Sequence, residues 1–277
     1  MSAYKPLTDL DERTAEVVPI YATSAARRQV LARALAAIDR QRWEEIKAKY
    51  AAELASYDEI GVFKYGDLPF WLAHKVKLAF DFGLDKRPPS TILDIGMGAG
   101  HFGAIAQAMG HRVVGTDIYE PLYEDIAALL GVDRRIVPVA SMTPMPSLGE
   151  RFDVATLIWQ VFDRRRIRTP QGRRWEFWSL EEWLFLLRDI ADNHLRPGGA
   201  IYLQLNQQPR PEGERFDPEL MAWAEARGAV RLAEMGDLAF ESLQPGSDFF
   251  TVDGPIPARP AEAAKPPGFF KRLLGRR

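Results

Sequence analysis

Three glycines and two carboxylates form the group of residues best suited to chemistry in this chain. Gly96, Gly98 and Gly100 alternate in a short stretch that follows Asp94, and Asp117 closes the next apolar run. Glycine admits positive φ and lets a ligand approach the backbone without a Cβ in the way. A carboxylate beside such a turn can accept both hydroxyls of a ribose. The pattern predicts half of a site for a nucleotide-type cofactor.

The elements that must position these residues can be read around them. Residues 91–95 are a β-prone apolar run between Pro88-Pro89 and glycine, which is typical of a buried parallel strand. Residues 101–109 predict a helix that stops at Gly110, and residues 112–117 predict a second strand. Asp117 should then lie at the carboxyl edge of the sheet, next to the glycine turn.

Two kinds of cofactor fit this geometry. Gly98, Gly100 and Gly103 satisfy the spacing of a dinucleotide fingerprint, so an NAD(P)-dependent oxidoreductase is one alternative. A diphosphate needs a helix N-terminus free of negative charge, however, and Asp94 stands just before the turn. That acid suits an ammonium and a sulfonium instead. The stretch from Asp94 to Gly100 resembles motif I of the class I S-adenosylmethionine-dependent methyltransferase superfamily, an acid followed by Gly-x-Gly-x-Gly.

The resemblance extends over roughly residues 60–253. Residues 151–159 look like the family's fourth strand, and residues 195–205 look like the fifth, entered through a Pro-Gly-Gly turn. A helix over 216–228 and strands over 229–234 and 248–252 are similar to the family's late, antiparallel elements. The resemblance implies an α/β, Rossmann-like fold with a central, mostly parallel seven-stranded sheet and helices on both faces.

S-adenosyl-L-methionine is the cofactor that the resemblance implies. The glycines would contact its methionine and ribose, Asp94 its amino group, and Asp117 its ribose hydroxyls. Ser141 stands where the family often has an acid that contacts the adenine, and residues just beyond the fourth strand would face the methyl donor. The residues expected to bind the cofactor are Asp94, Gly96, Met97, Gly98, Gly100, Asp117, Ile118, Ser141, Trp159 and Gln160.

The segment between Gln160 and Ser179 is expected to be a long loop that contacts the substrate. It carries several arginines and then Trp175 to Trp178, and a capping box at Ser179 and Glu182 begins the next helix. Guanidinium groups match carboxylates and phosphates, so an anionic acceptor is the hypothesis. The alternative is a solvated loop whose arginines pair with surface acids.

Candidates for proton transfer are Asp163, Tyr65 and His101, with Glu176 as a further acid. The four histidines are scattered and show no metal-ligand spacing, so no metal is expected. An Asn/Asp-Pro-Pro-aromatic motif does not follow the fourth strand, which argues against amino-group methylation of the DNA and glutamine type. The favoured function is transfer of a methyl group to oxygen of a small or medium-sized acceptor. A non-catalytic S-adenosylmethionine-binding protein is the other alternative.

Composition sets modest bounds. The chain has 277 residues, no cysteine and a net charge of −2, so disulfides are excluded and nothing suggests a nucleic-acid partner. Residues 1–19 lack a signal-peptide core, and no apolar run is long enough for a membrane span. A cytoplasmic protein is therefore expected.

Three regions are expected along the chain. Residues 1–85 form an N-terminal helical extension or cap, with amphipathic helices within 24–56 and a helix over 68–82 that Asp67 caps. Residues 86–253 form the methyltransferase domain, and residues 254–277 form a disordered basic tail. Its apolar pairs and cations suggest weak peripheral contact with the inner face of the membrane. A disordered end or a partner-binding segment is the favoured interpretation.

Overall fold

The computed structural model describes residues 4–56, 61–169, 172–210, 213–231 and 236–252. The basic tail predicted at 254–277 lies outside these residues. Among them, no helix has the length and apolar character needed to cross a membrane.

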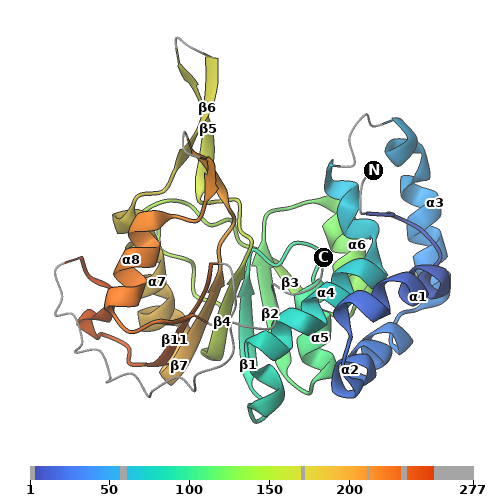
Figure 1. The fold of residues 1–277 in the computed structure, drawn as a ribbon, viewed down its shortest axis with the longest axis horizontal. Helices are drawn as coiled ribbons and strands as arrows, with labels where there is room; N and C mark the ends of the chain where they lie inside the picture. The colour runs from blue at the N-terminus through green and yellow to red at the C-terminus, as the bar shows by residue number, and fades with distance from the viewer. Residues whose placement is uncertain (1–3, 57–60, 170–171, 211–212, 232–235, 253–277) are drawn as a thin grey trace, which may run out of the picture.

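A seven-stranded sheet forms the centre of the molecule (Figure 1). In sheet order the strands are β10 (Val230–Arg231), β11 (Asp237–Leu243), β7 (Leu195–Gln204), β4 (Phe152–Ile158), β1 (Thr91–Ile95), β2 (Arg112–Asp117) and β3 (Asp133–Ile136). From β7 to β3 all neighbours pair in parallel, whereas β11 is antiparallel to both β7 and β10. The predicted Rossmann-like, mostly parallel fold is confirmed, and its outermost strand β10 is two residues long.

The last strand lies earlier in the chain than the sequence suggested. Residues 248–252 were expected to form it, but Asp248–Phe250 is a 3₁₀ helix, η4, and the strand is β11. In η4, the Phe250 ring stacks on Trp223, with ring centroids 5.8 Å apart. In β11, Phe240 and Ala239 enter the cores on opposite faces of the sheet. The apolar residues Phe249 and Phe250 thus pack near α8 instead of forming a strand. Their composition alone did not distinguish these two arrangements.

Helices cover both faces of the sheet. One face carries α4 (Leu68–Asp81), α5 (His101–Ala108) and α6 (Pro121–Leu129), and the other carries α7 (Leu180–Asp189) and α8 (Pro218–Ala226). Successive strand residues therefore enter different cores, as Ile92 and Leu93 do, and both are fully buried. Burial on both sides explains why these strands are continuous apolar runs.

The N-terminal extension contributes to the first of these cores. The helices predicted within 24–56 are α2 (Ala25–Ala36) and α3 (Arg40–Ser56), and α1 (Leu10–Tyr21) precedes them. Trp43 and Leu31 are buried there together with residues of the sheet. Asp67 caps α4 as predicted, accepting from the Phe70 amide, and it also forms a buried ion pair of 2.8 Å with Arg13. Asp67 directly follows η1 (Gly61–Gly66), the short 3₁₀ helix that carries Tyr65.

The segment predicted as a substrate loop is a hairpin. Strands β5 (Arg164–Thr169) and β6 (Gly172–Phe177) pair antiparallel and project beyond the sheet (Figure 1). The predicted capping box at Ser179 and Glu182 is present at the start of α7. The remaining short elements are η2 (Leu84–Lys86), the π-helical turn η3 (Ile190–His194), and a second hairpin of β8 (Gln208–Arg210) and β9 (Gly213–Arg215).

Candidate functional site

The glycine turn between β1 and α5 directs three of its amide groups toward the end of β2. Gly96, Gly98 and Gly100 have φ of 71°, 56° and 86°, values that side chains other than glycine rarely adopt. The amides of Gly96 and Met97 donate to the Thr116 carbonyl at 2.8 and 3.1 Å. The Gly98 amide donates to the Asp117 carboxylate. The turn is thus bound to the end of β2 by three hydrogen bonds.

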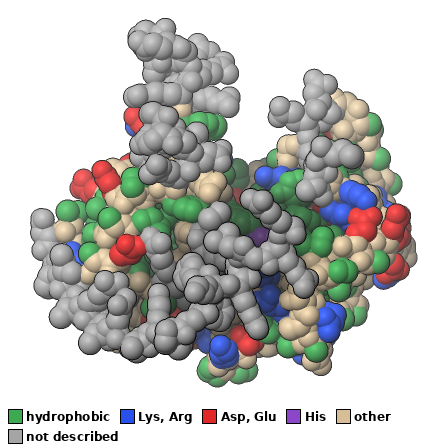
Figure 2. All heavy atoms as spheres, in the orientation of Figure 1, with side chains coloured by type: hydrophobic (Ala, Val, Ile, Leu, Met, Phe, Trp, Pro, Cys, Tyr) green, Lys and Arg blue, Asp and Glu red, His purple; other side chains and the backbone are tan. Residues whose placement is uncertain are grey.

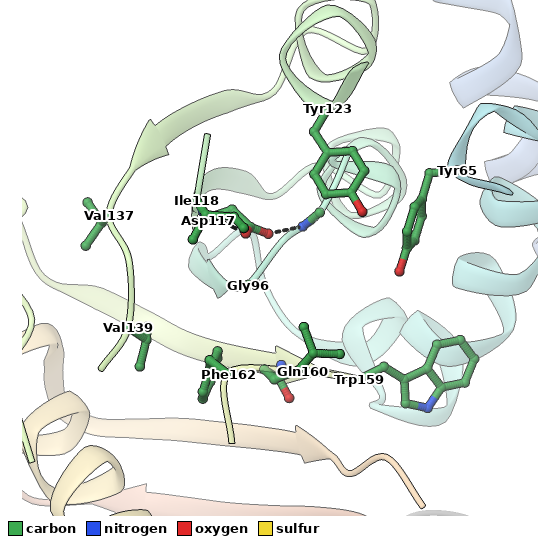
Figure 3. Close-up of a pocket in the computed structure, with 12 residues that line it drawn as sticks. Tyr65, Gly96, Asp117, Ile118, Tyr123, Val137, Val139, Trp159, Gln160 and Phe162 are labelled. Atoms are coloured by element: carbon green, nitrogen blue, oxygen red, sulfur yellow. Dashed lines mark hydrogen bonds between the residues drawn. The ribbon is translucent and has the colours of Figure 1, made fainter. Parts of the chain in front are cut away.

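The Asp117 carboxylate is held at the edge of this turn (Figure 3). One oxygen accepts from the Gly98 amide at 2.6 Å, and the other accepts from the Ile118 amide at 2.7 Å. A carboxylate has about four acceptor positions, so two remain for a ligand. The carboxylate is therefore already oriented to accept a pair of hydroxyl groups.

A cavity of about 310 Å³ opens at the carboxyl ends of β1, β2 and β4. This volume suits a small-molecule ligand. Figure 2 shows the same face hollowed between the side that carries α7 and the side that carries α6. The lining residues are Tyr65, Gly96, Gly98, Asp117, Ile118, Tyr123, Val137, Val139, Trp159, Gln160, Val161 and Phe162.

The cavity has two chemically different ends (Figure 3). Ile118, Val137 and Val139 form an apolar wall next to Asp117. Across the cavity, Tyr65 packs edge-on against Tyr123 with ring centroids 5.1 Å apart, and Trp159 lies beyond them. An apolar slot beside a carboxylate suits a base attached to a ribose, which leaves the aromatic end for the rest of the ligand.

Sequence reasoning missed several lining residues, namely Tyr123, Val137, Val139, Val161 and Phe162. The alternation of Val137 and Val139 just after β3 was a usable signal, because the residues after each parallel strand reach the same edge of the sheet. Tyr123 gave no comparable signal. Its position depends on how α6 packs beside η1.

The structure places six of the predicted cofactor residues on the cavity wall: Gly96, Gly98, Asp117, Ile118, Trp159 and Gln160. Asp94, Met97, Gly100 and Ser141 are not among its lining residues. The Met97 side chain packs over Gly115, where an added Cβ would lie 1.9 Å from its sulfur. Gly100 serves as the N-cap of α5. Both residues therefore contribute to the conformation of the turn without lining the cavity.

Ser141 lines a neighbouring hollow and not the cavity itself. Its hydroxyl donates to Glu182, which also closes the capping box of α7. Arg164, Arg165 and Trp178 line this hollow too, and Phe162 borders both spaces. The two spaces therefore adjoin at Phe162. The contact predicted between Ser141 and the adenine stays a prediction.

Asp94 is a buried residue of β1, just before the turn. It accepts a hydrogen bond of 2.8 Å from the Thr156 hydroxyl. Burial raises the pKa of Asp94 above its usual range, although the Thr156 hydrogen bond and the nearby Lys75 oppose this. Lys75 is itself 8% exposed, and burial lowers its pKa while Asp94 and then Asp237 raise it. A buried acid and a buried cation thus lie near each other behind the cavity.

Lys75 was not predicted as a site residue, although the sequence carried a signal. Leu68, Leu72, Val76 and Ala79 recur at three- and four-residue intervals and mark the buried face of α4. Lys75 occupies a position on that face, where a charged residue is unusual. Its ammonium lies 4.6 Å from the centre of the Trp159 ring, a cation–π contact.

Trp159 and Gln160 follow β4 directly. Trp159 has a φ of 54°, unusual for a bulky side chain, and its amide donates to the Gln204 carbonyl at 2.8 Å. The Gln160 amide group donates to the Ile95 carbonyl at 3.3 Å. The side-chain oxygen of Gln160 is buried and accepts no hydrogen bond from the described residues. It is therefore an available acceptor on the cavity wall.

The three candidates for proton transfer lie in different surroundings. Tyr65 lines the cavity, and burial raises its pKa, so its hydroxyl stays protonated. His101 is buried next to Tyr65, and its Nε2 lies 3.0 Å from the Tyr65 carbonyl. Burial lowers the pKa of His101 to about 3. Asp163 is buried beside Phe162, and burial raises its pKa to about 6. Their catalytic roles stay predictions.

Two cations lie beside the cavity: the Lys64 ammonium is 5.0 Å from the centre of the Tyr65 ring, and Arg164 lines the adjoining hollow. Arg164 is near enough to Lys64, next to Tyr65, to add to the lowering of the Lys64 pKa that burial causes. The Arg164 guanidinium also lies 5.0 Å from the centre of the Trp175 ring. Arg165, by contrast, forms an ion pair with Glu176, as the alternative of a paired surface arginine predicted.

The comparisons with known proteins yielded solved structures alone. No protein-family model matches the chain, and no curated protein matches it. The amino pentose methyltransferase CalS10 of Micromonospora echinaspora is 17% identical, with a TM-score of 0.37, and the match covers 60% of this chain and 58% of that one. This chain thus spans less than two thirds of that protein.

Two further structures show the same level of similarity. The mitomycin 7-O-methyltransferase MmcR is 16% identical with a TM-score of 0.37, and the match covers 73% of this chain and 67% of that one. A 1,6-didemethyltoxoflavin-N1-methyltransferase of Burkholderia thailandensis is 18% identical with a TM-score of 0.37, covering 74% and 87%. The strand order, with β11 inserted antiparallel next to β7, gives this chain the class I methyltransferase fold.

Proposed function

We propose that the protein binds S-adenosyl-L-methionine and transfers its methyl group to a small or medium-sized acceptor. One observation carries this proposal: the Asp117 carboxylate, held by the Gly98 and Ile118 amides, borders a cavity between an apolar wall and an aromatic end. A carboxylate suits the hydroxyls of a ribose and the apolar wall suits an adenine, and the amino-acid chain would extend from the ribose toward the aromatic end.

The residues of the cavity fit this cofactor. Asp117 would accept the ribose hydroxyls, and Ile118 with Val137 and Val139 would contact the adenine. The buried oxygen of Gln160 would accept from the amino group, with Asp94 behind the turn supplying negative charge. The cofactor supplies an activated methyl group on a positive sulfur, so the protein mainly has to align an acceptor with it.

The turn supports this cofactor better than a dinucleotide. A pyrophosphate is bound by free amides at a helix N-terminus. Here the amides of Gly96, Met97 and Gly98 already donate to Thr116 and Asp117.

Oxygen is the proposed methyl acceptor atom. Trp159 and Gln160 follow β4 in place of the motif for amino-group methylation, and Asp163, whose pKa burial raises to about 6, is suited to take up a proton near neutral pH. Lys64, beside Tyr65, and Arg164, in the adjoining hollow, favour an acceptor with a negative group. A panel of hydroxy acids and their uncharged analogues, incubated with S-adenosylmethionine labelled in the methyl group, tests the preference for a negatively charged acceptor. Methylation of the uncharged analogues at equal or higher kcat/KM would refute it.

Calorimetry on the full chain tests the cofactor assignment. We expect S-adenosylhomocysteine to bind with micromolar affinity and NAD to give no signal. Replacing Asp117 by Asn keeps the size of the side chain but turns one acceptor into a donor, which should weaken S-adenosylhomocysteine roughly 10- to 100-fold. A thermal melt of both proteins controls for folding. Binding of NAD without S-adenosylhomocysteine would refute the proposal in favour of an oxidoreductase.

A non-catalytic binding protein is distinguished by turnover. Such a protein would bind S-adenosylhomocysteine and respond to the Asp117→Asn change in the same way. It would nevertheless leave the methyl label untransferred across the whole acceptor panel.

A further inference from the structure

Lys75 places a buried ammonium group behind the aromatic end of the cavity, without a salt bridge to any of the described residues. Neither a hydrogen bond nor an ion pair joins its ammonium to any of the described residues, although 8% exposure leaves it little water. Its close partners are the rings of Trp159 at 4.6 Å and Trp71 at 5.7 Å. A buried charge without a counter-ion is costly, and cation–π contacts offset only part of that cost.

The groups around Lys75 include two acids that form no direct ion pair with it and several acceptors that receive no hydrogen bond from the described part of the chain. Asp94 and Asp237 are near enough to act on it electrostatically, but neither forms a salt bridge with it. The hydroxyl of Thr156 donates to Asp94, which occupies part of that carboxylate. The side-chain oxygens of Gln160, Gln204 and Asp237 include buried atoms that accept no hydrogen bond from the described residues. This region therefore holds both a cation and open acceptors, and such a pattern fits a zwitterion.

The cavity directs one end of its ligand toward this region. Asp117 and Ile118 lie on one side of the cavity, and Trp159 lies across it (Figure 3). A ligand whose ribose is held by Asp117 must extend its remaining chain toward Trp159. Trp159 lines the cavity, and its ring faces the Lys75 ammonium.

We infer that Lys75 binds the carboxylate of a ligand that ends in an α-amino acid and so makes the site selective for ligands that carry this group. The inference rests on the proposed function, because S-adenosylmethionine supplies both the ribose and the amino-acid end. The ammonium of that end would meet Gln160 and Asp94, and its carboxylate, attached to the same carbon, would meet Lys75. Lys75 thereby gains a direct ion pair, which none of the described residues provides.

Two ligands that differ by one carboxylate test this role. The full chain is titrated calorimetrically with S-adenosylmethionine and with decarboxylated S-adenosylmethionine. In Lys75→Met, S-adenosylmethionine should bind roughly 10- to 100-fold more weakly, because a charged hydrogen bond is lost. Decarboxylated S-adenosylmethionine should change by less than about threefold. Lys75→Arg should keep part of the preference for the carboxylate.

Lys77→Met is the matched control, because Lys77 lies on the same helix but is 49% exposed and paired with Asp81. It should change the affinity for neither ligand. Thermal melts monitor folding, and Lys75→Gln replaces Lys75→Met if the latter is unfolded. Equal weakening of both ligands, or no weakening of S-adenosylmethionine, would overturn the role of Lys75. Failure of the unaltered protein to bind S-adenosylmethionine would instead refute the proposed function.

Discussion

Replacing Gly98 by Ala distinguishes an effect on ligand binding from an effect on folding stability. Gly98 has a φ of 56°, and a Cβ built on it meets no atom within 4 Å. Because Gly98 borders the cavity, the added methyl group would enter the space proposed for the cofactor. The folded protein can accommodate this methyl group, but a ligand bound in the cavity would clash with it.

The magnitudes follow from these two features. A non-glycine residue in the left-handed region costs about 1–2 kcal/mol. For a chain of this size that lowers the melting temperature by roughly 2–8 °C. An extra methyl group in a well-packed site costs about 1–3 kcal/mol, so the Kd of S-adenosylhomocysteine should rise roughly 5- to 150-fold.

Gly131→Ala is the matched control for this experiment. Gly131 has a φ of 65°, has no atom within 4 Å of an added Cβ, and is not among the residues that line the cavity. It should show a similar fall in melting temperature and an unchanged Kd by calorimetry. If Gly98→Ala binds S-adenosylhomocysteine as tightly as the unaltered protein does, the ligand does not occupy this part of the cavity and the reasoning fails.

Two further predictions concern stability. Gly199→Ala should destabilise the protein by about 1–3 kcal/mol in urea unfolding, because its Cβ would lie 2.9 Å from the Arg196 carbonyl, which is backbone and cannot turn aside; an unchanged midpoint would contradict this. His101 binds fewer protons when folded, since burial lowers its pKa from 6.5 to about 3, so stability should fall as pH drops below about 6.5. Between pH 7 and 5, the free energy of unfolding should fall by about 2 kcal/mol less in His101→Gln than in the unaltered protein. Equal losses in both proteins would count against this role of His101.

The sequence alone determined the parts of the site that depend on neighbouring residues. A strand, a glycine turn, a helix and an acid at the end of the next strand lie within residues 91–117, and each follows from local rules for φ and capping. Parallel pairing of β1 with β2 and β4 then brings Asp117 and the residues after β4 to one edge of the sheet. For this reason Gly96, Gly98, Asp117 and Gln160 could be placed in advance.

The tertiary structure decided what distant elements contribute. Tyr123 reaches the cavity because α6 packs beside η1, and Lys75 lies behind Trp159 because α4 covers this end of the sheet. The hairpin of β5 and β6 and the position of β11 likewise depend on pairing between segments rather than on composition. Contacts between residues far apart in the chain are fixed by packing, and no spacing within one segment encodes them.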